Sequence, residues 1–360
     1  HTVRCCDLSI QKLDSCLDET TGIVAIYIAM HTATRIAVEA LPKVRQLAPR
    51  ASLCVYGLYA PMNADLFRSL GVGTVLGGEF ETGLVSMAQR IEAGGGEVQT
   101  EAETSLDKIT FIAPDRSKLP PLSQYARLIN PDCSEKTVGF AETTRGCKYL
   151  CRHCPVVPVY QGKFFAIPAD IVLDDIRTQV QAGAEHISFG DPDFFNGPGH
   201  ALRIVRTLHQ EFPALTYDAT IKIEHIVRYP EEIKVLKDTG CLFILSAVEA
   251  VDDTILALLD KGHTREDFIN ALAFLREIDI NLAPTFVAFT PWTTLDSYLQ
   301  LLEDIVTWQL IESVAPVQLS IRLLIPAGSY ILKLDNLDTI VGDFDAGILG
   351  HPWHNPDPRV

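Results

Sequence analysis

The first hundred residues alternate between short continuous apolar runs and longer stretches with apolar residues at helical spacing. Residues 23–29 (IVAIYIA) form a strand-sized run, whereas residues 35–47 repeat apolar positions every three or four residues. This alternation predicts a parallel sheet with helices on both faces. We expect strands at 2–7, 23–29, 52–59 and 74–76, and helices at 35–47, 64–70 and 81–93.

The pattern changes after residue 105. Prolines 114, 120, 121 and 131 interrupt regular structure, so residues 106–137 are interpreted as a linker that packs along the surface.

A second alternation begins at Val138 and predicts six strands linked by helices, which is typical of a partial β/α barrel. The reactive face of such a barrel lies at the carboxyl ends of its strands. We expect strands at 139–143, 186–189, 216–221, 242–247, 281–289 and 318–324, and helices at 170–182, 199–211, 230–238, 252–259 and 265–278. The fold class is therefore α/β, with a Rossmann-like domain at 1–105, the linker at 106–137, a partial (β/α)6 barrel at 138–330 and an extension at 331–360.

Composition narrows the class of protein. Hydrophobic residues make up 47% and charged residues 21% of the chain, which indicates a globular protein. A net charge of −16 argues against a nucleic-acid partner, and no apolar run approaches the roughly 18 residues of a membrane span. The odd count of nine cysteines and the lack of a signal peptide favour a reducing cytoplasm. Because the chain starts with His1, we expect its natural start to be missing.

Three cysteines, Cys147, Cys151 and Cys154, lie in a C-x3-C-x2-C pattern just after the first predicted barrel strand. A loop this short can direct three thiolates at three corners of a 4Fe–4S cluster and leave one iron open. A structural zinc site would need a fourth ligand such as His153, and an electron-carrying cluster would need Cys133. Three unrelated thiols are the remaining alternative. The spacing favours the open cluster.

The cysteine motif resembles that of the radical S-adenosylmethionine (SAM) superfamily, with His153 where the family usually has an aromatic residue. The resemblance implies that the open iron binds the amino and carboxylate groups of SAM, and that reduction cleaves a carbon–sulfur bond. Cys147, Cys151 and Cys154 are then the catalytic metal ligands. The residues expected to contact SAM are Tyr149, His153, Gly190, Asp191, Pro192, Asp193, Lys222, Glu224, Glu249 and Arg322.

Several of these residues have a structural alternative. Residues 189–193 (FGDPD) also fit a capped turn before a helix, and Glu249 with Lys261 also fits a surface ion pair. Arg322 lies inside an apolar run and needs a partner, which is either a ligand carboxylate or an acidic side chain.

The amino-terminal domain resembles a cobalamin-binding domain, with Gly57, Leu58 and the segment 77–79 (GGE) near the places expected for it. The cobalt-ligating signature D-x-H-x-x-G is incomplete, because the segment around His31 lacks both the aspartate and the glycine. Two alternatives stay open: cobalamin binds without this ligand, or the domain only shapes the cavity.

Residues 7–14, 30–35, 56–61 and 351–356 (DLSIQKLD, MHTATR, YGLYAP and HPWHNP) resemble the radical SAM proteins named for a CUAEP or CCAEP tail, a group that includes the enzyme of arsinothricin biosynthesis. The tail is not in this sequence, and Cys5 and Cys6 are interpreted as structural.

The group implies transfer of the 3-amino-3-carboxypropyl group of SAM to trivalent arsenic, giving hydroxyarsinothricin and methylthioadenosine. Arsenite is then the substrate, and flavodoxin or ferredoxin the electron donor. The alternatives are a cobalamin-dependent radical methyltransferase and a non-catalytic iron–sulfur or arsenic-binding protein.

Overall fold

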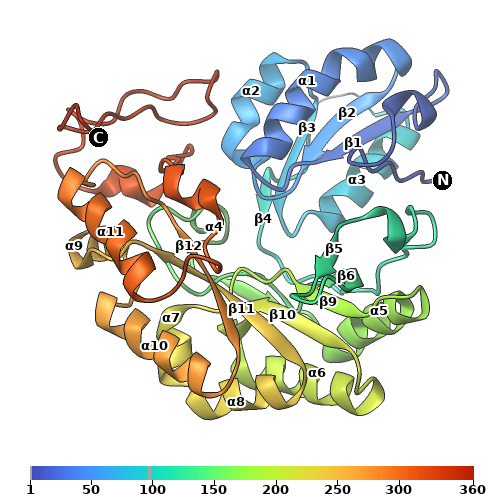
Figure 1. Ribbon diagram of the computed structural model, residues 1–360. Helices are drawn as coiled ribbons and strands as arrows, with labels where there is room; N and C mark the ends of the chain where they lie inside the picture. The colour runs from blue at the N-terminus through green and yellow to red at the C-terminus, as the bar shows by residue number, and fades with distance from the viewer. Residues whose placement is uncertain (1, 96–98) are drawn as a thin grey trace.

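The computed structural model describes residues 2–95 and 99–360. Figure 1 shows a blue amino-terminal sheet with its helices at the top, a larger sheet with its helices below, and a red carboxyl-terminal segment at the upper left. Among the described residues, no helix is long and apolar enough to cross a membrane.

The amino-terminal sheet has four parallel strands in the order β1-β2-β3-β4. Its strands are β1 (Ile23–Tyr27), β2 (Ser52–Tyr56), β3 (Thr74–Gly78) and β4 (Thr104–Ser105). Its helices are α1 (His31–Leu47), α2 (Ala64–Ser69) and α3 (Glu81–Glu92), with short 3-10 turns η1 (Leu13–Ser15) and η2 (Pro61–Asn63).

Helices cover both faces of this sheet. Leu41 of α1 and Phe67 of α2 pack in one apolar cluster with Val55 of the sheet. Met87 of α3 packs on the other face against Leu76. The predicted two-faced α/β arrangement is therefore confirmed.

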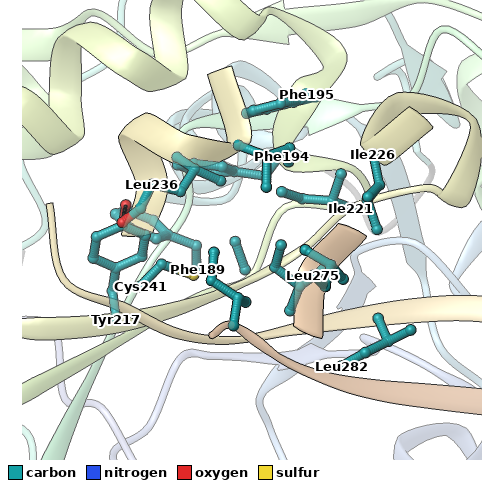
Figure 2. Packing of buried hydrophobic residues seen from close by; sticks show 14 of the residues in the cluster. Phe189, Phe194, Phe195, Tyr217, Ile221, Ile226, Leu236, Cys241, Leu275 and Leu282 are labelled. Atoms are coloured by element: carbon teal, nitrogen blue, oxygen red, sulfur yellow. Dashed lines mark hydrogen bonds between the residues drawn. The ribbon is translucent and has the colours of Figure 1, made fainter. Parts of the chain in front are cut away.

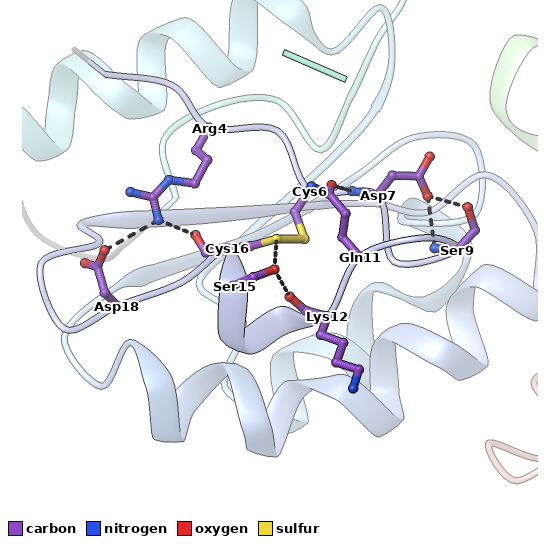
Figure 3. Close-up of a disulfide and its surroundings, with 9 residues drawn as sticks. All are labelled: Arg4, Cys6, Asp7, Ser9, Gln11, Lys12, Ser15, Cys16 and Asp18. Atoms are coloured by element: carbon purple, nitrogen blue, oxygen red, sulfur yellow. Dashed lines mark hydrogen bonds and ion pairs between the residues drawn. A yellow bond between two sulfur atoms is a disulfide. The ribbon is translucent and has the colours of Figure 1, made fainter. Parts of the chain in front are cut away.

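The strand predicted at residues 2–7 is wrong. Cys6 is joined to Cys16 by a disulfide, and Arg4 Nη1 donates to the carbonyl of Cys16 at 2.9 Å (Figure 3). Asp7 then caps the following turn. These contacts draw the segment into an irregular path, so β1 stays the edge strand, and they give Cys6 a structural role.

The larger sheet has the order β12-β11-β10-β9-β6-β5, and all its strands are parallel except β5. The strands are β5 (Arg127–Ile129), β6 (Glu135–Ala141), β9 (His186–Phe189), β10 (Thr216–Thr220), β11 (Cys241–Glu249) and β12 (Asn281–Phe286), and a separate hairpin contains β7 (Thr144–Gly146) and β8 (Phe164–Ala166). The helices are α4 (Val156–Tyr160), α5 (Ala169–Gln181), α6 (Pro198–Glu211), α7 (Ile223–Arg228), α8 (Pro230–Asp238), α9 (Asp253–Leu259), α10 (Arg265–Glu277) and α11 (Leu295–Thr307), and the 3-10 turns are η3 (Leu122–Gln124), η4 (Phe194–Asn196), η5 (Pro316–Ser320) and η6 (Tyr330–Lys333).

The last predicted barrel strand, at residues 318–324, is also wrong. The 3-10 turn η5 occupies its start, and a single bridge joins Phe289 to Arg322. The amide oxygen of Gln318 accepts from the backbone N–H of Phe286 at 3.1 Å. The Gln318 side chain therefore occupies the backbone N–H of Phe286 that a strand next to β12 would otherwise have bound. The half-barrel predicted for this part of the chain is nevertheless confirmed.

The main core lies between this sheet and its helices. Phe189 and Tyr217 point from β9 and β10 toward Phe194, Leu236 and Leu275 (Figure 2). Burying each of these side chains stabilises the fold by about 1.5–3 kcal/mol. Because strand side chains alternate, the intervening residues face the concave side of the sheet.

Residues of the predicted linker 106–137 lie against the barrel, but β5 and the start of β6 also fall within it and belong to the larger sheet. Arg116 pairs with Asp175 of α5 at 2.6 and 2.9 Å and donates to the carbonyl of Phe140 on β6. These contacts fix the segment between the two sheets.

Candidate active site

The three predicted cluster ligands lie on one short loop at the carboxyl end of the barrel. The loop follows Gly146, the last residue of β7, and ends at Pro155 before α4. Cys147 and Cys151 are buried, and Cys154 is half-buried. The amide of Cys154 donates to the carbonyl of Cys151 at 3.0 Å, so the last two cysteines share one turn.

The thiols have apolar surroundings. Cys147 packs with Val156, Val159 and Tyr160, and Cys154 lies against the same cluster. Burial raises the pKa of Cys147 to about 12 and that of Cys154 to about 11. Ligation by a cationic cluster reverses this effect, because a metal deprotonates a coordinating thiol.

The donor set of the cysteine loop fits an iron–sulfur cluster. Three thiols lie on one short loop, and cysteine thiolates are the usual ligands of 4Fe–4S clusters. Three such ligands leave one iron open.

The segment after β9 holds the start of the cysteine loop. Asp191 accepts hydrogen bonds from the amide and hydroxyl of Thr143 at 2.9 and 2.7 Å, and from the hydroxyl of Thr144 at 2.6 Å. Asn196 Nδ2 donates to the carbonyl of Gly146 at 3.1 Å. Asp191, which was expected to contact SAM, thus has both oxygens engaged by threonines. The capped turn considered for residues 189–193 is present at Asp193, whose side chain accepts from the amide of Phe195 at the start of η4.

The packing of a neighbouring ring explains why residue 190 is a glycine. A Cβ there would collide with the ring of Phe140, so glycine makes room for this ring. Pro192 is exposed between the buried Asp191 and Asp193. Contact of these residues with SAM stays a prediction.

A buried chain of hydrogen bonds connects three segments. His225 Nδ1 lies 3.3 Å from Asp193 Oδ1, and its Nε2 lies 2.5 Å from the Tyr149 hydroxyl. Asp193 and His225 are 1% and 0% exposed. The Nζ atom of Lys222 lies 3.4 Å from the centroid of the Tyr149 ring and 3.3 Å from Glu224 Oε2. Four predicted SAM-contact residues, Tyr149, Asp193, Lys222 and Glu224, are thereby brought together.

Glu249 and His153 meet at the end of β11. His153 Nε2 lies 3.0 Å from Glu249 Oε1, and Lys261 Nζ lies 3.5 Å from the same oxygen. Burial alone would raise the pKa of Glu249, but Lys261 and His153 lower it to about 2. The ion pair considered for Glu249 and Lys261 therefore exists, and it is buried.

Several buried nitrogen atoms beside these residues make no hydrogen bond to any other residue that the structure describes. They are Lys222 Nζ, Nδ1 of His153 and both ring nitrogens of His263. Burial and the nearby cations Lys261 and Lys222 lower the pKa of His263 to about 4, so its ring is neutral. Buried polar atoms without partners are costly and mark a place for a polar ligand. The carboxylate, ammonium and ribose hydroxyls of SAM offer such partners, so these residues fit SAM.

Arg322 is not the buried charge that the sequence suggested. It is exposed, and its guanidinium lies 4.0 Å from the centroid of the Trp353 ring. Trp353 Nε1 in turn donates to the carbonyl of Leu323 at 2.6 Å. Because its segment is not a barrel strand, Arg322 anchors the carboxyl-terminal extension.

His31 does not fit a cobalt ligand. Its Nε2 atom lies 2.8 Å from the carbonyl oxygen of Ile348 in the extension. This bond matches the ordinary hydrogen-bonding role of a histidine at a strand end.

The first domain nevertheless touches the cysteine loop. Glu79, at the end of β3, accepts from the Tyr160 hydroxyl at 3.1 Å and pairs with Arg145 at 3.4 Å. Leu58 packs against the cluster that contains Cys147. The domain therefore forms one wall of the region around the thiols.

Sequence reasoning missed His225, Thr143 and Thr144. His225 follows Lys222 by one helical turn, a spacing that could have placed both side chains on one face. The threonines directly precede the cysteine motif, but nothing local indicated that Asp191 would bind them.

Residues 141–303 match the profile of the Radical SAM superfamily. The chain is 25% identical over 192 residues to the tRNA-2-methylthio-N(6)-dimethylallyladenosine synthase of Haemophilus influenzae strain PittEE, which covers 50% of this chain and 40% of that protein. It is 21% identical over 310 residues to a Methanocaldococcus jannaschii protein described as a methylthiotransferase, covering 81% of this chain and 66% of that protein. This chain thus spans less than two thirds of each relative.

Two solved structures share the fold. The cobalamin-dependent SAM radical enzyme OxsB with aqua-cobalamin bound has a TM-score of 0.66 and 15% identity, over 93% of this chain and 56% of that one. The radical SAM methyltransferase TsrM from Kitasatospora setae, with cobalamin and a [4Fe-4S] cluster bound, has a TM-score of 0.60 and 17% identity, over 80% of this chain and 60% of that one. In both comparisons the shared fold extends over most of this chain.

Proposed function

Because residues 141–303 match the Radical SAM superfamily, we propose that the chain cleaves SAM and transfers the 3-amino-3-carboxypropyl group to trivalent arsenic. The observation that carries the SAM chemistry is the loop of Cys147, Cys151 and Cys154 beside buried nitrogens that make no hydrogen bond to the described residues. The arsenic acceptor rests on the resemblance to the CUAEP/CCAEP-tail group.

The residues at the strand ends have distinct roles in this proposal. Lys222 and His263 bind the carboxylate of SAM, since their side-chain nitrogens are buried and make no hydrogen bond to the described residues. Glu224, 3.3 Å from Lys222, accepts from the ribose hydroxyls. Tyr149 orients Lys222 under its ring. Glu249 acts through His153 and holds the loop between Cys151 and Cys154 in place.

When bound, a reduced 4Fe–4S cluster would supply the electron that opens a carbon–sulfur bond of the sulfonium, and one electron would return to the cluster as arsenic reaches the pentavalent state. Overall the transfer is redox-neutral. The bond from sulfur to the aminocarboxypropyl carbon breaks, its electron pair stays on methylthioadenosine, and a carbon–arsenic bond forms. Arsenic rises from trivalent to pentavalent, and one proton leaves as arsenous acid becomes the arsonic acid hydroxyarsinothricin.

The proposal includes partners. Flavodoxin or ferredoxin provides the electron, and arsenite is the small-molecule acceptor. We place the reaction in the cytoplasm, where thiols and a reducing protein partner are maintained.

Product identification tests the function. Anaerobically reconstituted protein is mixed with dithionite, SAM and arsenite. We expect methylthioadenosine and hydroxyarsinothricin in equal amounts. Formation of 5′-deoxyadenosine without methylthioadenosine would refute the proposed bond cleavage, and absence of any SAM cleavage would leave a non-catalytic iron–sulfur protein.

A cobalamin-dependent methyltransferase is the second candidate. Its support is the likeness to OxsB and TsrM over both sheets, and the engagement of His31 by Ile348 counts against it. It predicts bound corrinoid after reconstitution with hydroxocobalamin and S-adenosylhomocysteine as the product.

A further inference from the structure

The cysteine loop is tied to the amino-terminal domain through Arg145, a residue to which no step above assigns a role. Arg145 is part of β7 and precedes Cys147 by two positions. Its Nη1 atom donates to Glu79 Oε2 at 3.4 Å and to Glu81 Oε1. Both carboxylates lie just after β3, the third strand of the first domain. One side chain therefore joins the start of the cysteine loop to the other sheet.

Two aromatic rings also contact the guanidinium of Arg145. Its central carbon lies 5.6 Å from the centroid of the Phe80 ring, and 5.2 Å from the centroid of the Phe111 ring in the segment between the two sheets. Aromatic faces of this kind suit a planar guanidinium better than an ammonium. The Arg145 side chain is only 22% exposed. Packing as well as charge therefore fixes its direction.

Glu79 provides a second connection to the cysteine loop. Its side chain is fully buried, and Oε1 accepts a hydrogen bond from the Tyr160 hydroxyl at 3.1 Å. Tyr160 packs in the apolar cluster that contains Cys147. A Cβ on Gly146 would lie 2.5 Å from the Tyr160 ring, so glycine makes room for this ring at the start of the loop. Glu79 thus supports Cys147 through packing, and Arg145 supports it through the chain.

The turn after β3 holds Glu79 in place. Gly78 has a φ of +67°, a left-handed conformation that glycine adopts without strain. A Cβ on Gly78 would lie 2.1 Å from the carbonyl oxygen of Ser105 on β4. The backbone N–H of Glu79 donates to the same carbonyl at 2.8 Å. The backbone of Glu79 is therefore fixed at the end of the first sheet.

Three carboxylates lie around the guanidinium, those of Glu79, Glu81 and Glu142. Glu142 Oε2 is 3.8 Å from Arg145 Nε, and the other two are the hydrogen-bond acceptors described above. Charges in partly buried surroundings interact more strongly than charges in water. The net charge close to an iron–sulfur cluster is one of the quantities that set its reduction potential. A buried carboxylate and a guanidinium beside the cysteine loop therefore bear on any cluster that the loop binds.

We propose that Arg145 and Glu79 are positioning residues for the cluster, which hold the cysteine loop on the amino-terminal domain and set the reduction potential of the 4Fe–4S cluster bound there. The proposal rests on the cluster of the proposed function and not on arsenic as the acceptor. Reduction adds one negative charge to the cluster. The carboxylate of Glu79 therefore opposes reduction, and the guanidinium of Arg145 favours it.

A redox titration of the reconstituted protein, followed by electron paramagnetic resonance, tests this assignment. Glu79→Gln removes a negative charge and should raise the midpoint potential, whereas Arg145→Met removes a positive charge and should lower it. Shifts of the same sign, or no shift, overturn the proposal, because a loop that was merely less well packed would change both potentials in one direction. The titration needs no acceptor, so a protein that forms no hydroxyarsinothricin overturns only the proposed function.

Two further variants separate the charge of Arg145 from its contribution to folding. Arg145→Lys keeps the positive charge and should return the potential most of the way to the wild-type value. Arg116→Met is the matched control, because Arg116 also pairs with a buried carboxylate, that of Asp175, but on α5 and away from the loop. It should lose comparable stability and keep the wild-type potential and spectrum. If Arg145→Met takes up no iron, Glu79→Gln decides alone, and a potential that does not rise overturns the proposal.

Discussion

The hydroxyl of Tyr149 lies 2.5 Å from Nε2 of His225, although the two residues are 76 positions apart in the chain. Through this contact the cysteine loop is tied to α7, and through Asp193 to the segment after β9. The ring of the same tyrosine covers the ammonium of Lys222. One side chain therefore links the cluster ligands to the residues proposed to bind SAM.

Removing this hydroxyl should weaken SAM binding. In Tyr149→Phe, Nε2 of the buried His225 loses its partner, which we expect to cost about 1–3 kcal/mol of unfolding free energy. Because the loop is then less well held against Lys222, the Kd for SAM, measured by equilibrium dialysis, should rise several-fold. Tyr217→Phe, whose hydroxyl donates to the Leu236 carbonyl in the core, should lose similar stability with an unchanged Kd. Equal Kd values in both variants would show that the Tyr149 hydroxyl has only a structural role.

The buried pair of Glu249 and Lys261 should make stability depend on pH. The pKa of Glu249, about 2, lies below that of an unfolded glutamate, about 4.3, so the ionised side chain stabilises the fold above pH 4.3. This contribution should decline as the pH falls from there toward 2. Glu249→Gln leaves Lys261 without its charge partner and should cost about 3 kcal/mol at neutral pH.

Denaturant unfolding of wild type and Glu249→Gln between pH 8 and pH 3 measures this difference. We expect a constant gap above about pH 5 that narrows at lower pH. Glu231→Gln, at an exposed ion pair with Lys234, should change stability by less than about 0.5 kcal/mol at every pH. A gap that does not narrow on acidification would argue against the pair.

Each of the three loop cysteines should be required for the cluster. Alanine at Cys147, Cys151 or Cys154 should abolish iron and sulfide incorporation, because every thiolate holds a separate iron. Alanine at the exposed Cys133 should leave the iron content at wild-type level. Loss of iron in Cys133→Ala would instead support a four-cysteine cluster.

Lys222 and Arg322 should respond differently to alanine substitution, although the sequence assigned both to SAM. Lys222→Ala should raise the Kd for SAM about tenfold or more, since its buried ammonium is proposed to bind the carboxylate. Arg322→Ala should leave that Kd unchanged and speed proteolysis of the extension, because it removes about 0.5–1 kcal/mol of contact with Trp353. A weaker SAM complex in Arg322→Ala would contradict the position described for this residue.

Local patterns predicted most of the fold correctly. The runs at residues 186–189 and 230–238 correspond to β9 and α8 with the same bounds. The short strands β4, β5, β7 and β8 were not predicted, and the two strands that were predicted wrongly lie where a side chain or a disulfide replaced a backbone ladder. Gln318 occupies the N–H of Phe286, and Cys6 is bonded to Cys16. Hydrophobic periodicity predicts neither contact. Gln318 and Phe286 are far apart in the sequence, and Cys6 with Cys16 is one of many possible pairs among nine cysteines.

The sequence by itself determined the α/β class and the cysteine motif, because both depend on spacings within a few residues. Only the tertiary structure decided which distant polar groups meet that motif. It turned Asp191 toward Thr143 and Thr144, placed Arg322 on Trp353, and brought His225 to Tyr149. These outcomes follow from strand order and from the requirement that buried polar groups find partners, and both are properties of the whole packed chain.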